Sequence, residues 1–158
     1  MASILCDTSK NVYALNTGQK KTYLIKEIFM GSGYKFQCEK CGYGLEYLQG
    51  VGFFYCAEAD NILTDMKNGK MGKKFMEYAK KSKTPTIIHS RELYKCINCG
   101  EVRPDMKIEL YNGKSLLNEK RHICGKCRSK MNIVKDTSKL KCPHCATKLL
   151  LSNFIMWD

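Results

Sequence analysis

The chain lacks the long apolar runs that mark a membrane protein. Its apolar runs, such as residues 149–151 and 154–157, are far short of the roughly 18–20 residues that span a bilayer. The first ten residues also lack a basic segment followed by an apolar stretch, which is the pattern of a secretory signal. We therefore expect a cytoplasmic, reducing location and no membrane partner.

Residue sets typical of catalysis are also missing. No Ser-His-Asp set, phosphate-binding glycine loop or pair of catalytic carboxylates emerges from the sequence. We therefore expect the protein not to be an enzyme. Only four of the 27 basic residues are arginines, and arginine suits bidentate base recognition better than lysine does. The scarcity of arginine argues against sequence-specific reading of nucleic acid.

Cysteine, by contrast, is abundant. Eight of the ten cysteines form four Cys-X-X-Cys knuckles, and two such knuckles can complete a tetrahedral four-sulfur metal site. In a reducing compartment this pattern favours metal binding over disulfides. The predicted ligands of two zinc ions are Cys38, Cys41, Cys96, Cys99, Cys124, Cys127, Cys142 and Cys145.

Spacing favours a sequential pairing of the knuckles. Fourteen residues separate Cys127 from Cys142, close to the usual 15–20 for paired knuckles, so the last two knuckles are predicted to share one zinc. The first two, which are 54 residues apart, then pair by elimination. The alternative joins the second knuckle to the third across 24 residues, and the first to the fourth. The sequential arrangement loses less loop-closure entropy.

The knuckles resemble those of the zinc-ribbon, or rubredoxin-like, class. Residues 36–47 are similar to a rubredoxin first knuckle and residues 142–145 to a second, although the connection is much longer here and Ala146 replaces a usual glycine. The chain looks like small uncharacterised bacterial or phage zinc-ribbon proteins. The resemblance implies knuckles carried on short antiparallel hairpins, and it implies a fold without a particular function. A rubredoxin-like iron electron carrier is an alternative reading.

The expected fold is small, metal-stabilised and mainly β, with two zinc ribbons of antiparallel hairpins. Residues 1–111 are predicted to form an N-terminal hairpin and a first ribbon with a helical insertion at about 57–83, and residues 112–158 a second ribbon. Apolar residues at helical spacing, interrupted at Asn68-Gly69, predict two short helices or one kinked helix in the insertion. Asn112-Gly113 predicts a tight hairpin turn.

Both metal sites are expected to be structural. Four thiolates complete the tetrahedron and leave no open position for substrate or water. The metal supplies stability that the core of a small ribbon cannot. Because the cysteines already complete both ligand sets, His89, His122 and His144 are expected to be surface or structural residues.

The charge favours a polyanionic partner. The formal charge of +12 falls to about +8 when two sites, each with four thiolates and one divalent ion, are counted. The lysines between residues 67 and 83 predict a phosphate-binding helix face, and a second basic group surrounds the third knuckle. The alternatives are a merely solvated helix face and a protein-interaction adaptor without nucleic-acid affinity. The candidate nucleic-acid contacts are Lys67, Lys70, Lys74, Lys81, Lys120, Arg121, Lys126, Arg128 and Lys130.

Overall fold

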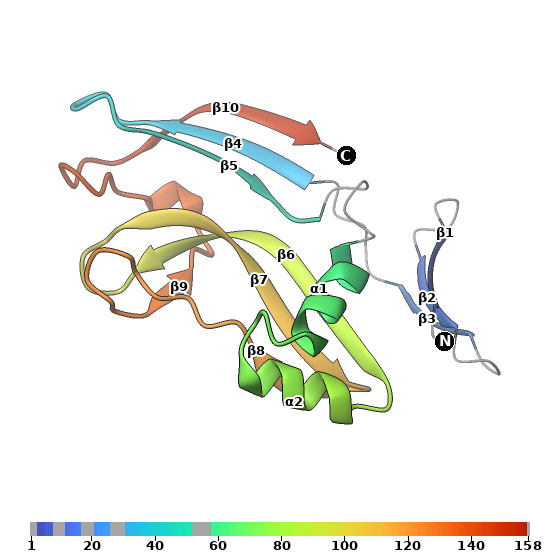
Figure 1. The fold of residues 1–158 in the computed structure, drawn as a ribbon. Coiled ribbons are helices and arrows are strands. Elements are labelled where there is room, and N and C mark those ends of the chain that lie inside the picture. Colours follow the sequence, from blue (N-terminus) through green and yellow to red (C-terminus); the bar gives the residue numbers. More distant parts are fainter. Residues whose placement is uncertain (1–2, 8–11, 17–20, 26–30, 52–57, 158) are drawn as a thin grey trace.

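The computed structural model describes residues 3–7, 12–16, 21–25, 31–51 and 58–157. These residues form three antiparallel sheets and two short α-helices (Figure 1), which confirms the mainly-β expectation. The elements are β1 (Ser3–Asp7), β2 (Val12–Asn16), β3 (Lys21–Ile25), β4 (Gly31–Gln37), β5 (Gly44–Gln49), α1 (Glu58–Lys67), α2 (Lys73–Lys81), β6 (Pro85–Cys96), β7 (Val102–Asn112), β8 (Ser115–Glu119), β9 (Met131–Ile133), a 3₁₀ turn (Thr137–Lys139) and β10 (Leu150–Trp157).

The first sheet has the strand order β1-β2-β3. β2 pairs antiparallel with β3, from Asn16 opposite Lys21 to Val12 opposite Ile25, which agrees with the predicted N-terminal hairpin. The residues between these two strands, 17–20, are outside the described residues. β1 adds a strand that the sequence did not predict.

The second sheet has the order β10-β4-β5, so the last strand of the chain pairs with a strand more than 110 residues earlier. β4 and β5 form a hairpin whose turn is the first knuckle, since Gln37 pairs with Gly44 on either side of it. β10 lies along the other side of β4, from Leu150 opposite Gln37 to Trp157 opposite Gly31 (Figure 1). A strand from the predicted second ribbon thus completes the sheet of the first.

The third sheet has the order β8-β7-β6-β9. β6 and β7 form a long hairpin that pairs from Pro85 opposite Asn112 to Lys95 opposite Val102, and its turn is the second knuckle. The predicted Asn112-Gly113 turn is present between β7 and β8, where Gly113 adopts a φ of 60°. β9 adds to β6 next to the second knuckle, with Met131 opposite Cys96.

The two helices confirm the predicted insertion and cover the third sheet. α1 ends just before Asn68-Gly69, where Gly69 adopts a φ of 79° that suits glycine. The buried helix residues Met66, Phe75 and Ala79 pack against Ile108 and Leu110 of β7. This packing turns the remaining faces of the helices, which carry the lysines, to solvent.

The predicted division between residues 111 and 112 falls within β7. Strand pairing links residues on both sides of that division, because β10 joins β4 and β9 joins β6. The independent folding of two such units stays a prediction.

Candidate metal centre

The eight knuckle cysteines form two groups of four. We call the group formed by the first and fourth knuckles the outer site; it contains Cys38, Cys41, Cys142 and Cys145. The group formed by the second and third knuckles is the inner site; it contains Cys96, Cys99, Cys124 and Cys127. Within each group all four Sγ atoms lie within 4.8 Å of one another. Each group can therefore hold one metal ion, and the predicted set of eight ligands is brought together.

The predicted sequential pairing of knuckles is wrong, and the nested alternative is the one the structure adopts. The first knuckle joins the fourth across 100 intervening residues, and the second joins the third across 24. From these loop lengths, against 54 and 14 for the sequential version, the entropic penalty of nesting is only about 1 kcal/mol. Leu140 and Leu149, which flank the fourth knuckle, are each 2% exposed in the core beside Cys38. Burial of a single leucine contributes about 1.5–3 kcal/mol, so packing outweighs loop entropy.

All four knuckles share one local geometry. In each knuckle, the residue before the first cysteine pairs with the third residue after the second cysteine, as Gln37 pairs with Gly44. This pair belongs to two strands in the first two knuckles and is an isolated bridge in the last two. The backbone N–H of each first cysteine donates to a carbonyl five residues on, at 2.7–2.9 Å. Backbone N–H groups also donate to sulfur, for example from Asn98 to Cys96 Sγ and from His144 to Cys142 Sγ, both at 3.4 Å. These turns direct both sulfurs of a knuckle to the same side.

The residue after each second cysteine occupies the left-handed region. Gly42 and Gly100 have φ values of 72° and 73°, which glycine adopts without steric strain. Arg128 and Ala146 hold the same position with φ values of 62° and 60°, although a side chain there costs about 1–2 kcal/mol. The third and fourth knuckles therefore keep the same turn as the first two, even though the residue after the second cysteine is strained.

Sulfur–sulfur distances fit a metal and exclude disulfides. Sulfurs from different knuckles approach to 3.4 and 3.5 Å in the outer site, and to 3.4 and 3.6 Å in the inner site. A disulfide bond measures about 2.05 Å. A tetrahedral metal with sulfur bonds of about 2.3 Å has sulfur–sulfur edges of about 3.8 Å. The four thiols of each site are thus close to the positions that a tetrahedral ion requires.

The thiols of the inner site cannot all ionise without a compensating cation. Hydrogen bonds from the hydroxyl and backbone N–H of Ser129 lower the pKa of Cys127 to about 5. The backbone N–H of Glu101 acts to lower the pKa of Cys99, but desolvation and the neighbouring sulfurs outweigh it and raise that pKa to about 12. A divalent cation at the centre removes this conflict, because it stabilises every thiolate at once.

The outer site repeats the pattern with different residues. Hydrogen bonds from the hydroxyl and backbone N–H of Thr147 lower the pKa of Cys145 to about 6. The Tyr43 backbone N–H acts to lower the pKa of Cys41, yet desolvation and three neighbouring sulfurs raise it to about 12. The sequence analysis did not identify Ser129 and Thr147. Their common position, two residues after the second cysteine, is the pattern that could have revealed them.

In each knuckle the first cysteine is buried and the second is more exposed. Cys38, Cys96, Cys124 and Cys142 are at most 2% exposed, and each belongs to a hydrophobic cluster. Both sites therefore lie where the tip of a hairpin meets the core. An ion bound at either site would connect that hairpin tip to the core.

His122 is a structural residue, as expected. It is buried beside Tyr94 with ring centroids 3.7 Å apart, and its Nδ1 lies 3.0 Å from Asp105 Oδ2. Burial of Asp105 acts to raise its pKa, but hydrogen bonds from Lys120, the Met106 backbone N–H and His122 hold that pKa below its ordinary value. The cluster ties the third knuckle to β6 and β7.

The other two histidines are also outside the ligand sets. His144 lies in the fourth knuckle and its ring meets Tyr43 of the first at a centroid distance of 4.7 Å. His89, on β6, lies 4.0 Å from a carboxylate oxygen of Glu58. The remaining cysteines, Cys6 and Cys56, are not among the described side chains.

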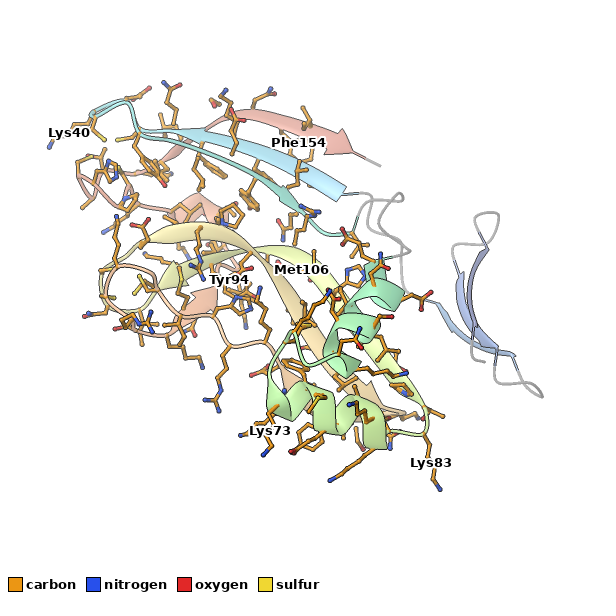
Figure 2. The ribbon with its side chains drawn as sticks, in the orientation of Figure 1. Lys40, Lys73, Lys83, Tyr94, Met106 and Phe154 are labelled. Carbon is orange, nitrogen blue, oxygen red and sulfur yellow. The ribbon has the colours of Figure 1, made fainter. Side chains whose placement is uncertain are left out.

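The predicted basic residues fall into two groups on different elements. Lys67, Lys74 and Lys81 are exposed on α1 and α2, and no ion pair to them occurs among the described residues. Lys70 differs, because its Nζ lies 2.7 Å from Asp65. Figure 2 shows Lys73 and Lys83 projecting from opposite ends of this helical region. We call the exposed faces of α1 and α2, with Lys67, Lys74 and Lys81, the lysine surface.

The second basic group is partly neutralised. Lys120 pairs with Asp105 at 2.7 Å, and Lys126 pairs with Glu101. The other three predicted contacts are exposed and form no ion pair among the residues described; they are Arg121, Arg128 and Lys130. Each basic group therefore contains three exposed cations without an ion pair among the described residues, and those of the lysine surface lie on two adjacent helices.

Comparison with protein-family models, curated proteins and solved structures gave no match to this chain. In the described residues, no helix has the length and apolar character needed to cross a bilayer. The arrangement of the thiols therefore carries the functional argument.

Proposed function

We propose that this is a non-enzymatic zinc protein that binds nucleic acid, or an assembly containing nucleic acid, through the lysine surface. The observation that carries the proposal is the pair of four-sulfur groups, each complete without a further ligand. A closed four-sulfur site has no position for substrate or water, which supports a structural role for both ions.

Zinc is the proposed metal because it prefers tetrahedral thiolate ligands and has no redox chemistry. Iron favours the same ligands, so metal analysis of the purified protein decides between them. We expect two zinc ions per chain and a colourless solution. A red protein with iron in both sites would contradict the zinc assignment and would favour an electron carrier.

The lysine surface supports a polyanionic partner because three of its exposed lysines have no ion pair among the described residues, whereas Asp65 and Glu77 on the same helices pair with Lys70 and Lys73. Three exposed ammonium groups without ion pairs attract phosphates and release counterions when they bind them. Lysine contributes this attraction without reading bases. We therefore propose binding that depends on charge and has little sequence preference.

Binding to duplex DNA and to RNA, measured against salt concentration, tests this proposal. Each phosphate contact contributes a log–log slope of about −0.9 on duplex DNA, so replacing Lys67, Lys74 and Lys81 with glutamate should remove about three units of slope. The matched control replaces three exposed lysines near the fourth knuckle with glutamate, at Lys135, Lys141 and Lys148.

The outcomes separate the proposals. The lysine-surface variant should bind much more weakly than the control, although both change the net charge equally. Equal losses would show a general charge effect and would contradict the assigned surface. An absence of binding at low salt would contradict nucleic-acid binding and favour a protein-interaction adaptor.

A further inference from the structure

β10 is an open edge of the second sheet. It pairs with β4 on one side, and among the described strands it has no partner on the other (Figure 1). A register irregularity falls between Leu151 and Asn153, where Ser152 Oγ donates to the Lys35 carbonyl at 3.0 Å. Beyond this bulge, residues 153–157 pair regularly with β4. An edge of this kind presents backbone N–H and C=O groups to solvent; in β10 the Phe154 N–H donates to the Asn153 side chain at 2.8 Å, which an added strand would have to displace.

The edge is apolar on both faces and uncharged. No charged residue occurs between 149 and 157. Phe154 and Ile155, which point to opposite faces of the sheet because they are consecutive, are 48% and 51% exposed. Ile155 also covers Gly33, where an added Cβ would lie only 2.4 Å from the isoleucine side chain. The edge strand is therefore held in place by β4 and keeps about half of these side chains exposed.

The other edges of the second and third sheets carry the usual protection against strand pairing. β9 has only three residues. β8 ends in Glu119, and the whole strand is flanked by Lys114 and Lys120. β5 carries Glu46, and Gly50 just beyond it is bridged to Arg91 of β6. Short length and charge are the common means by which edge strands avoid pairing. β10, with eight uncharged residues, has neither.

We infer that β10 is a dimerisation edge, at which a second copy of this chain adds its own β10 antiparallel to form a continuous six-stranded sheet. A two-fold axis relates identical surfaces, so an edge that is apolar on both faces is complementary to itself. The regular stretch 153–157 is centred on Ile155, which places the two copies of this residue opposite each other at the axis.

Charge favours a second copy over an acidic partner. The formal charge of about +8 with both ions bound repels a second copy at long range, so contact between copies is least unfavourable at a surface that adds no further charge. β10 provides such a surface, whereas an acidic partner would be attracted to the lysine surface. Figure 1 places β10 and α2 at opposite sides of the structure. A dimer through β10 thus leaves both lysine surfaces free.

The regular part of the edge is short, so the dimer should form reversibly. A pairing of five residues per chain buries much less than the roughly 1,200 Å² of a standard interface. The dimer population should therefore rise with protein concentration. Sedimentation velocity of the full-length, metal-loaded chain, from low to several hundred micromolar, should show a shift from monomer to dimer mass.

Two matched lysine substitutions test the position of the interface. Ile155→Lys places two ammonium groups opposite each other at the axis and should weaken dimerisation at least tenfold. Leu116→Lys introduces the same charge at a leucine of β8 that is 49% exposed, and it should leave dimerisation unchanged. Metal content and circular dichroism establish that both variants are folded.

Hydrogen exchange of the wild-type chain provides a test that needs no variant. The outward-facing amides of β10 should become protected as concentration rises, while those of β8 should not. A monomer at every concentration would overturn the inference. Equal weakening by both substitutions, or concentration-dependent protection confined to β8, would overturn it as well.

Discussion

The nested pairing of the knuckles can be tested with two fourfold substitutions of equal size. The first replaces every cysteine of the outer site with serine: Cys38, Cys41, Cys142 and Cys145. The structure assigns these residues to a single ion, so the variant should retain one metal per chain. Under sequential pairing the same variant would have no intact site and would retain none.

The matched control replaces the cysteines of the first two knuckles instead: Cys38, Cys41, Cys96 and Cys99. This variant removes two ligands from each nested site and should retain no tightly bound metal. Sequential pairing predicts the opposite result, with one ion held by the last two knuckles. Nested pairing therefore predicts one ion in the first variant and none in the second, and sequential pairing predicts the reverse.

The energetic consequence follows from the location of the outer site. Structural zinc contributes roughly 10–16 kcal/mol in peptide systems, which equals or exceeds the 5–15 kcal/mol of a typical domain. Loss of the outer ion should therefore unfold the β10-β4-β5 sheet, whose core includes Phe36 and Tyr47. The β6–β7 hairpin keeps its own ion and the helices packed on it, so it should stay folded.

Metal content after gel filtration, together with hydrogen exchange, measures both effects. In the outer-site variant we expect one ion per chain, rapid exchange in β4 and continued protection in β6 and β7. If this variant bound no metal while the control bound one ion, the nested arrangement and the packing argument behind it would be refuted.

Three further predictions concern individual residues. Ala146→Gly and Arg128→Gly should each stabilise the metal-loaded fold by about 0.5–1 kcal/mol, because glycine relieves the left-handed strain but loses more entropy on folding; a lower midpoint in chemical denaturation would contradict this. Leu110→Ala should destabilise the chain by about 2–5 kcal/mol, since this side chain is fully buried under the helices; denaturation with full metal content is the measurement, and a loss below about 1 kcal/mol would argue against the helix–sheet core. Because the folded-state pKa of Asp105 is depressed, its carboxylate stabilises the fold above a pH of about 4 and loses this effect as pH falls through the folded value. The free energy of unfolding of the wild type should exceed that of Asp105→Asn by about 1–2 kcal/mol at neutral pH, and this difference should shrink in acid. Metal content is monitored in the same samples. A difference independent of pH would contradict the role assigned to Asp105.

Local features were predictable from the sequence because the interactions that form them are local. The helix break at Asn68-Gly69 and the turn at Asn112-Gly113 depend on residues that tolerate positive φ. The lengths of β6 and β7 were underestimated, since the resemblance to zinc ribbons implied only short hairpins. The extension of this hairpin is supported by helix packing against Ile108 and Leu110, which no local pattern contains.

The sequence by itself identified the eight candidate metal ligands and the form of each knuckle. In all four knuckles the backbone N–H of the first cysteine donates to a carbonyl five residues on, so the Cys-X-X-Cys spacing specifies most of the local geometry. The tertiary structure alone decided which knuckles share an ion. That choice depended on the burial of Leu140 and Leu149 and on the addition of β10 to β4. These contacts join distant residues, and their packing energy exceeds the roughly 1 kcal/mol of loop entropy that favoured the sequential pairing.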